Sequence, residues 1–189
     1  MELLEALPIA RAEFERRLRA VTADQWDAPT PCAGWSVRDL ANHIVAGNRM
    51  SVMRLHGADR EDVLAAITGG NLGDDPIGAF TATADAQEVA FGEPGAFDRV
   101  CHTMAGEMPG AQLLAFRIGD YTLHAWDLAR GLGGDESLPE PVVALIWENL
   151  QPLAPRIGQI GVFGSGPSGN VAGDAPLQDR LLDLTGRRA

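Results

Sequence analysis

The stretch PGAQLLAFRIGDYTLHAWDLARGLG, residues 109–133, decides the fold of this chain. Its proline suits the first turn of a helix, and the two glycines near its end suit the close of one. Between them, Leu113, Phe116 and Leu128 share one helical face, which predicts that this face is buried. The stretch therefore predicts a long helix over 109–131 that packs against other helices.

Three other stretches, at 2–23, 37–56 and 77–91, also carry apolar residues at helical spacing. The second begins with a capping-box-like pair, Ser36 and Asp39, whose side chains can satisfy free amides at a helix start. The third has a proline at a position suited to the first helical residue, and its apolar positions are expected to face inward: Phe80, Ala84, Val89 and Phe91.

The remaining segments are expected to hold shorter elements. Brief helices are predicted over 61–68, over 140–151 and over the sequence QDRLLDL near the C-terminus. Residues 92–108 are expected to form a loop with brief extended structure, and 158–173, with six glycines in sixteen residues, an irregular crossover. Four long helices with few strands predict an all-α fold, a four-helix bundle forming a single domain over residues 1–189.

The composition excludes several classes of function. With 26 acidic and 15 basic residues, the chain has a formal net charge of -11, which disfavours binding to nucleic acid. All the basic residues are Arg, so lysine Schiff-base chemistry and a P-loop lysine are excluded. No signal peptide and no membrane-spanning run is found, and Cys32 and Cys101 form no CxxC pair. A cytoplasmic protein with no membrane partner is expected.

Two of the four histidines are candidates for a metal site. His124 follows Asp120 by four residues on the predicted long helix, so both side chains lie on one face. His43 lies on the inner stripe of the helix over 37–56, and ligands from two helices can meet inside a bundle. The spacing alone equally fits a hydrogen-bonded Asp and His pair and a satisfied core histidine. His56 and His102 are given no role.

Four motifs in order carry a resemblance to a known family. They are PTPCAGWSVRDLANHIVAGN at 29–48, GEMPG at 106–110, DYTLHAWDLARGLG at 120–133 and QDRLLDLTGR at 178–187. Together they resemble the actinobacterial metal-binding branch of the DinB-like superfamily, which includes mycothiol-dependent maleylpyruvate isomerase and related thiol transferases. The resemblance implies a DinB-like four-helix bundle in which His43, Asp120 and His124 hold one divalent metal. It implies zinc, with nickel as the alternative, and a possible homodimer.

The chain departs from that family in two ways. Relatives generally have Glu where this chain has Asp120, which is shorter by one methylene group. The isomerase also has a C-terminal domain after the bundle, for which 189 residues leave no room. The activity is therefore less firmly implied than the metal.

The leading hypothesis is a metal-dependent transferase or isomerase that uses a low-molecular-weight thiol of the mycothiol type and acts on a small electrophile. The alternatives are a non-catalytic metal-binding or stress-response module and a metal-dependent hydrolase, which would need a general base such as Glu107 or Glu148.

Several residues could support such a site, although the sequence identifies no catalytic residue. Asp127 could orient the His124 ring, or be a surface charge at the helix end. A substrate carboxylate could bind Arg49, Arg117 or Arg130. Cys32 precedes a helix start, where a thiol pKa is lowered, but it also fits a loop cysteine packed beside a tryptophan.

Overall fold

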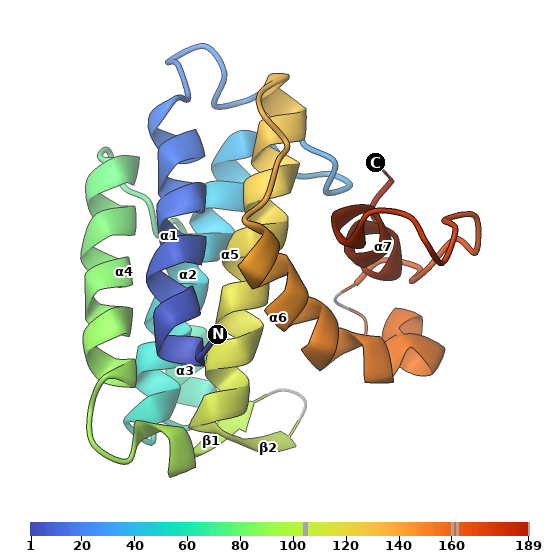
Figure 1. Ribbon diagram of the computed structural model, residues 1–189. Coiled ribbons are helices and arrows are strands. Elements are labelled where there is room, and N and C mark those ends of the chain that lie inside the picture. The colour runs from blue at the N-terminus through green and yellow to red at the C-terminus, as the bar shows by residue number, and fades with distance from the viewer. Residues whose placement is uncertain (104–105, 160, 162, 189) are drawn as a thin grey trace. The chain divides into compact units, whose positions relative to one another are not determined.

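A computed structural model describes residues 1–103, 106–159, 161 and 163–188 (Figure 1). The chain forms two compact units, a larger one over residues 2–136 and a smaller one that comprises residue 1 and the segment from 137 onward. The prediction of a single domain over 1–189 stays a prediction.

The larger unit is a bundle of four long helices, α1 (Leu3–Arg19), α2 (Val37–Leu55), α4 (Pro76–Phe91) and α5 (Gly110–Leu132). Helix α1 packs on α5, and α2 packs on both α4 and α5 (Figure 1). The interior contains the rings of Phe14, Phe80 and Tyr121, whose centroids lie 5.3 to 6.1 Å apart. The predicted all-α four-helix bundle is confirmed.

Local sequence signals explain where these helices begin and end. The Ser36 hydroxyl accepts a hydrogen bond from the Asp39 amide, and the Asp39 carboxylate accepts one from the Ser36 amide, so the predicted capping box is formed at α2. Pro76 is the first residue of α4, as predicted. Helix α5 ends at Leu132, and the next residue, Gly133, has a φ of 66°, which suits glycine.

The bundle differs from the predictions in detail. Helix α1 stops at Arg19, four residues short of the predicted end. Val89 is 70% exposed, so the expectation that it faces inward was wrong. The buried face of α4 passes through Phe80, Ala84, Gln87 and Phe91, and a residue two positions from Gln87 points away from it.

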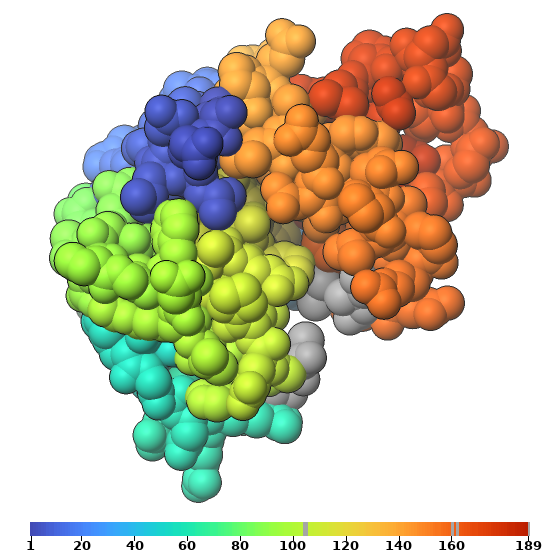
Figure 2. Space-filling model, turned by 60° about the horizontal axis from the view of Figure 1, so that its bottom comes forward, coloured from blue at the N-terminus to red at the C-terminus, as the bar shows by residue number. Residues whose placement is uncertain are grey.

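The segment before α5 contains the brief extended structure that was predicted for residues 92–108. After a 3-10 turn at Ala96–Asp98, strand β1 (Val100–Thr103) pairs antiparallel with β2 (Gly106–Pro109). Residues 104 and 105 of the predicted loop lie outside the described residues. Pro109 ends β2, and α5 therefore begins at Gly110. Helix α3 (Arg60–Ile67) contacts α2, and the end of the bundle with α3 and the hairpin faces the viewer in Figure 2.

The smaller unit contains α6 (Glu140–Leu150), a 3-10 segment η2 (Gln151–Gln159) and α7 (Leu177–Leu184), which contact one another. The chain continues as a 3-10 helix through Pro152 and Pro155, where the sequence predicted the end of helical structure. The described part of 158–173 is irregular as expected, with residues 160 and 162 outside the described residues. Among the helices described, none is long and apolar enough to cross a membrane.

Candidate metal centre

Three predicted ligands lie together on two neighbouring helices of the bundle, with His124 buried and the side chains of His43 and Asp120 partly exposed. His43 comes from α2, and Asp120 and His124 lie one turn apart on α5. Asp120 Oδ1 lies 3.3 Å from Nε2 of His43 and 3.3 Å from Nε2 of His124. The ligand atoms of all three residues lie within 4.8 Å of one another. The structure therefore brings together the three residues that the resemblance implied.

The spacing of these atoms fits a shared cation. Ligands about 2.1 Å from a tetrahedral zinc ion are separated from one another by about 3.4 Å, and the two oxygen-to-nitrogen distances here are 3.3 Å. Two imidazoles and one carboxylate are also a donor set that zinc and nickel accept. The same distances fit hydrogen bonds from the imidazoles to the carboxylate, so the metal itself is a proposal.

Asp127 fixes the orientation of one imidazole. Its Oδ2 lies 2.8 Å from Nδ1 of His124, and its side chain is buried rather than exposed at the helix end. When Nδ1 carries the proton and donates to Asp127, the lone pair of Nε2 points toward Asp120. The structure thus places Asp127 where it can orient His124 for metal binding.

The charges of the group are strongly coupled. Burial disfavours the charged form of His124, but its hydrogen bonds to Asp120 and Asp127 outweigh this and hold its pKa well above the usual value. Burial also opposes ionisation of Asp120, yet nearby Arg117 and His43 hold the pKa of that carboxyl well below its usual range. These partners favour the ionised form of the Asp120 carboxylate.

The guanidinium of Arg117 forms an ion pair with the second carboxylate oxygen of Asp120. Its Nη1 donates to Asp120 Oδ2, and its Nη2 donates to Asn48 Oδ1 at 2.8 Å and to the Ile44 carbonyl at 3.3 Å. Only 6% of the residue is exposed. This burial argues against the predicted contact between Arg117 and a substrate carboxylate.

The other two predicted arginines lie elsewhere on the larger unit. Arg49 donates to Asn71 Oδ1 at 3.0 Å and borders a mostly apolar pocket of about 370 Å³. Arg130 lies over the ring of Trp126, 4.6 Å from its centroid, and pairs with Glu136 at 2.6 Å. A role for Arg49 or Arg130 in binding a substrate stays a prediction.

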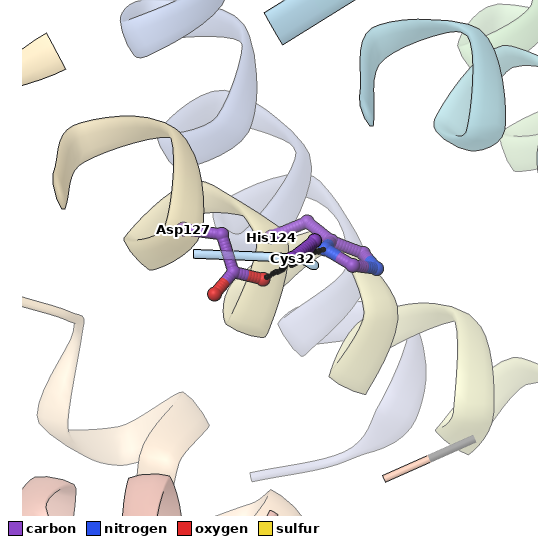
Figure 3. A group of neighbouring side chains, drawn as sticks. All are labelled: Cys32, His124 and Asp127. Carbon is purple, nitrogen blue, oxygen red and sulfur yellow. Dashed lines mark hydrogen bonds and ion pairs between the residues drawn. The ribbon is translucent and has the colours of Figure 1, made fainter. Parts of the chain in front are cut away.

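Cys32, for which the sequence left both a role at a helix start and packing beside Trp35 open, is a neighbour of the site. Its Sγ donates to Asp127 Oδ2 at 3.3 Å and lies 3.8 Å from Nδ1 of His124 (Figure 3). The ring of Trp35 lies 4.9 Å from that of His43 and 5.9 Å from that of His124. Both residues therefore support the imidazoles from the loop that precedes α2.

Local hydrogen bonds hold this loop in place. Pro29 and Ser36 form an isolated antiparallel bridge, and the Thr30 amide donates to the Trp35 carbonyl at 3.0 Å. The loop approaches α5 at Gly131, where an added Cβ would lie 3.0 Å from the Pro29 carbonyl oxygen. The motif PTPCAGW was the signal for this arrangement, but its partner on α5 could not be read from spacing.

Known proteins resemble the chain over most of its length. Residues 7–129 match the family described as the mycothiol maleylpyruvate isomerase N-terminal domain. Uncharacterized proteins from two strains of Mycobacterium tuberculosis are 31% identical over 99% of this chain and 98% of their own length.

Two solved structures share the fold. A crystal structure of the mycothiol-dependent maleylpyruvate isomerase has a TM-score of 0.61 at 20% identity, covering 86% of this chain and 72% of that one. A histidine-to-alanine mutant of that isomerase has a TM-score of 0.59 at 20% identity, covering 88% and 74%. The resemblance stated from the motifs is confirmed, and the chain belongs to the mycothiol maleylpyruvate isomerase N-terminal domain family.

Proposed function

We propose that the protein binds one divalent metal ion through His43, Asp120 and His124 and uses it in a thiol-dependent isomerase or transferase reaction on a small electrophile. Zinc is the first candidate and nickel the second. The observation that carries the proposal is the position of Asp120 Oδ1, 3.3 Å from Nε2 of both histidines. The thiol is proposed because the solved relatives are described as mycothiol-dependent.

The chemistry follows from the donor set. Three protein ligands leave part of the coordination sphere open, as in catalytic rather than structural zinc sites. A divalent ion held there would lower the pKa of a bound low-molecular-weight thiol and so favour its thiolate, the nucleophilic form. With a metal on Nε2, His124 would carry its proton on Nδ1 and donate it to Asp127. The ring of Trp35 packs against both imidazoles.

The hydrolase alternative receives less support. A hydrolase would need a general base near the metal, and both glutamates considered for that role are exposed. Glu107 lies in the hairpin, where its carboxylate is 3.4 Å from His102. The non-catalytic module differs from the main proposal only in turnover, so assays must separate the two. A homodimer and a cytoplasmic location stay predictions.

Metal analysis tests the shared premise. Protein purified without chelators is expected to contain about one equivalent of metal, and less than about a tenth of an equivalent after zinc loading would refute the site. His43→Ala and His124→Ala are expected to lose the metal with helical circular dichroism retained. His56→Ala and His102→Ala are matched controls, because these exposed histidines pair with Glu93 and Glu107 instead.

Thiol consumption tests the reaction. The zinc-loaded protein is incubated with mycothiol, or a small thiol in its place, and an electrophile such as an epoxide, and free thiol is followed over time. Consumption above the uncatalysed rate, lost in His43→Ala, supports a transferase. Maleylpyruvate with mycothiol tests the isomerase, with the change in substrate absorbance as the readout. No turnover across the panel would favour the non-catalytic module.

A further inference from the structure

A buried guanidinium lies directly behind the candidate metal ligands. Arg117 is on α5, one turn before Asp120, and its side chain reaches across to α2. It contacts Asp120 Oδ2, Asn48 Oδ1 and the Ile44 carbonyl oxygen. A planar group held at three points has little freedom to move, so its position relative to the carboxylate is fixed.

The space that Arg117 occupies depends on a glycine. A Cβ built at Gly47 would lie 2.1 Å from Arg117 Nη1 and 2.6 Å from its Cζ. Gly47 is in the middle of α2, where glycine costs about 1 kcal/mol relative to alanine. The absence of a side chain at 47 is therefore what lets the guanidinium reach Asp120.

Asn48 accepts a hydrogen bond from Arg117 and is itself held in place by two other residues. Its Oδ1 accepts from Arg117 and, at 2.8 Å, from the Tyr121 hydroxyl, while its Nδ2 donates to Thr83 Oγ1 at 3.2 Å. Asn48 is fully buried. Two donors on one side of the amide and an acceptor on the other determine which way it faces. The oxygen that receives Arg117 is thus held by residues of three helices.

This arrangement divides the two oxygens of Asp120 between two tasks. Oδ2 is engaged by Arg117, and Oδ1 lies between the two imidazoles. Arg117, Asp120 and Asp127 together then carry a charge of about -1, because the guanidinium offsets one of the two carboxylates and a ligating imidazole is neutral. A divalent cation bound to this set would leave the centre with a net positive charge toward any further ligand, whereas without Arg117 the same centre would be neutral.

We propose that Arg117 is a positioning residue that leaves Asp120 one oxygen for the metal and offsets its charge, so that the bound cation prefers an anionic ligand. The inference rests on the proposed metal function. It names the class of ligand that the open position favours, namely a monoanion such as a thiolate, over a neutral donor. Asp120 then acts as a ligand with one oxygen only, because Arg117, three positions earlier on the same helix, engages the other.

The test compares an anionic probe with a neutral one on the cobalt-substituted protein. Azide and imidazole are titrated separately into wild type, Arg117→Gln and Arg117→Lys, and the visible cobalt bands report both binding and coordination. Removing one nearby charge is expected to weaken azide about tenfold relative to imidazole in Arg117→Gln. Arg117→Lys is expected to restore most of the azide preference. The ligand-free cobalt spectrum of Arg117→Gln is expected to change, because the second Asp120 oxygen becomes available.

The outcomes separate the inference from the proposed function. Equal changes for azide and imidazole, or no change for either, would overturn the role of Arg117. Wild-type protein that binds no cobalt would refute the metal site itself before any variant is compared. If circular dichroism shows that Arg117→Gln is unfolded, Gly47→Ala replaces it. That variant keeps the arginine but displaces it, and the same tenfold loss of azide preference is expected.

Discussion

Replacing Asp127 tests whether the orientation of His124 controls metal binding. Asp127 Oδ2 lies 2.8 Å from His124 Nδ1 and also accepts from the Cys32 thiol. In Asp127→Asn, the amide oxygen can take the place of Oδ2, so the ring keeps its orientation but loses a charged partner. In Asp127→Ala, both the orientation and the charge are lost.

The size of each effect follows from what is lost. Partners of this kind change metal affinity by 10- to 100-fold. We expect Asp127→Asn to weaken zinc binding about tenfold, or about 1.4 kcal/mol, because only the charge is removed. Asp127→Ala is expected to weaken it about a hundredfold, or about 2.7 kcal/mol, because the Nδ1 proton also loses its acceptor.

The assay is competition for zinc against a chromophoric chelator at fixed pH. Asp98→Asn is the control, since it makes the same chemical change at an exposed position on the larger unit and is expected to bind like wild type. Zinc affinities of both Asp127 variants within twofold of wild type would refute the reasoning. That result would mean that Nε2 of His124 is not a ligand, or that other contacts orient the ring.

Three further predictions concern the bundle around the site. Burial raises the pKa of Tyr121 to about 12 in the folded protein. In the unfolded chain the pKa of a tyrosine is about 10. The folded state therefore binds the proton more tightly, and the free energy of unfolding should fall by about 3 kcal/mol as pH rises from about 10 to 12. Tyr121 is the sole tyrosine, so tyrosinate absorbance follows it alone, and titration near pH 10 in the folded protein would contradict this. Gly131→Ala should destabilise the fold by about 1 kcal/mol in chemical denaturation, because its Cβ would crowd the Pro29 carbonyl; a gain in stability would show that the loop can yield. Ser36→Ala should cost about 1 kcal/mol through loss of the α2 cap, and Ser36→Thr, which keeps the hydroxyl, should cost less.

The sequence was sufficient for the bundle because its helix ends depend on neighbouring residues. The Ser36 cap and the proline that opens α4 act within one helical turn, and their effects can be read from spacing. The predictions were wrong where a local pattern fitted more than one structure. Val89 is apolar but lies off the buried face, and η2 continues through two prolines by adopting 3-10 geometry.

The candidate site was predictable only in part. The four-residue spacing of Asp120 and His124 placed them on one face, but the addition of His43 depended on the family resemblance. The contact between Cys32 and Asp127 joins residues 95 positions apart. Likewise, spacing puts Arg117 beside Asp120, but its burial depends on a glycine of another helix. Such contacts are set by packing between elements, which no local pattern encodes.

The shared amide of Asn48 links the interior of the bundle to the three candidate metal ligands through Arg117. An aliphatic residue of similar size at position 48 would fill the same space without the amide. Here that exchange would strip Tyr121 and Arg117 of a common acceptor at once. Two buried donors would lose their partner, so the stability of the bundle should fall. The ligand preference of the proposed cation centre should change as well, although none of its three candidate ligands had been altered.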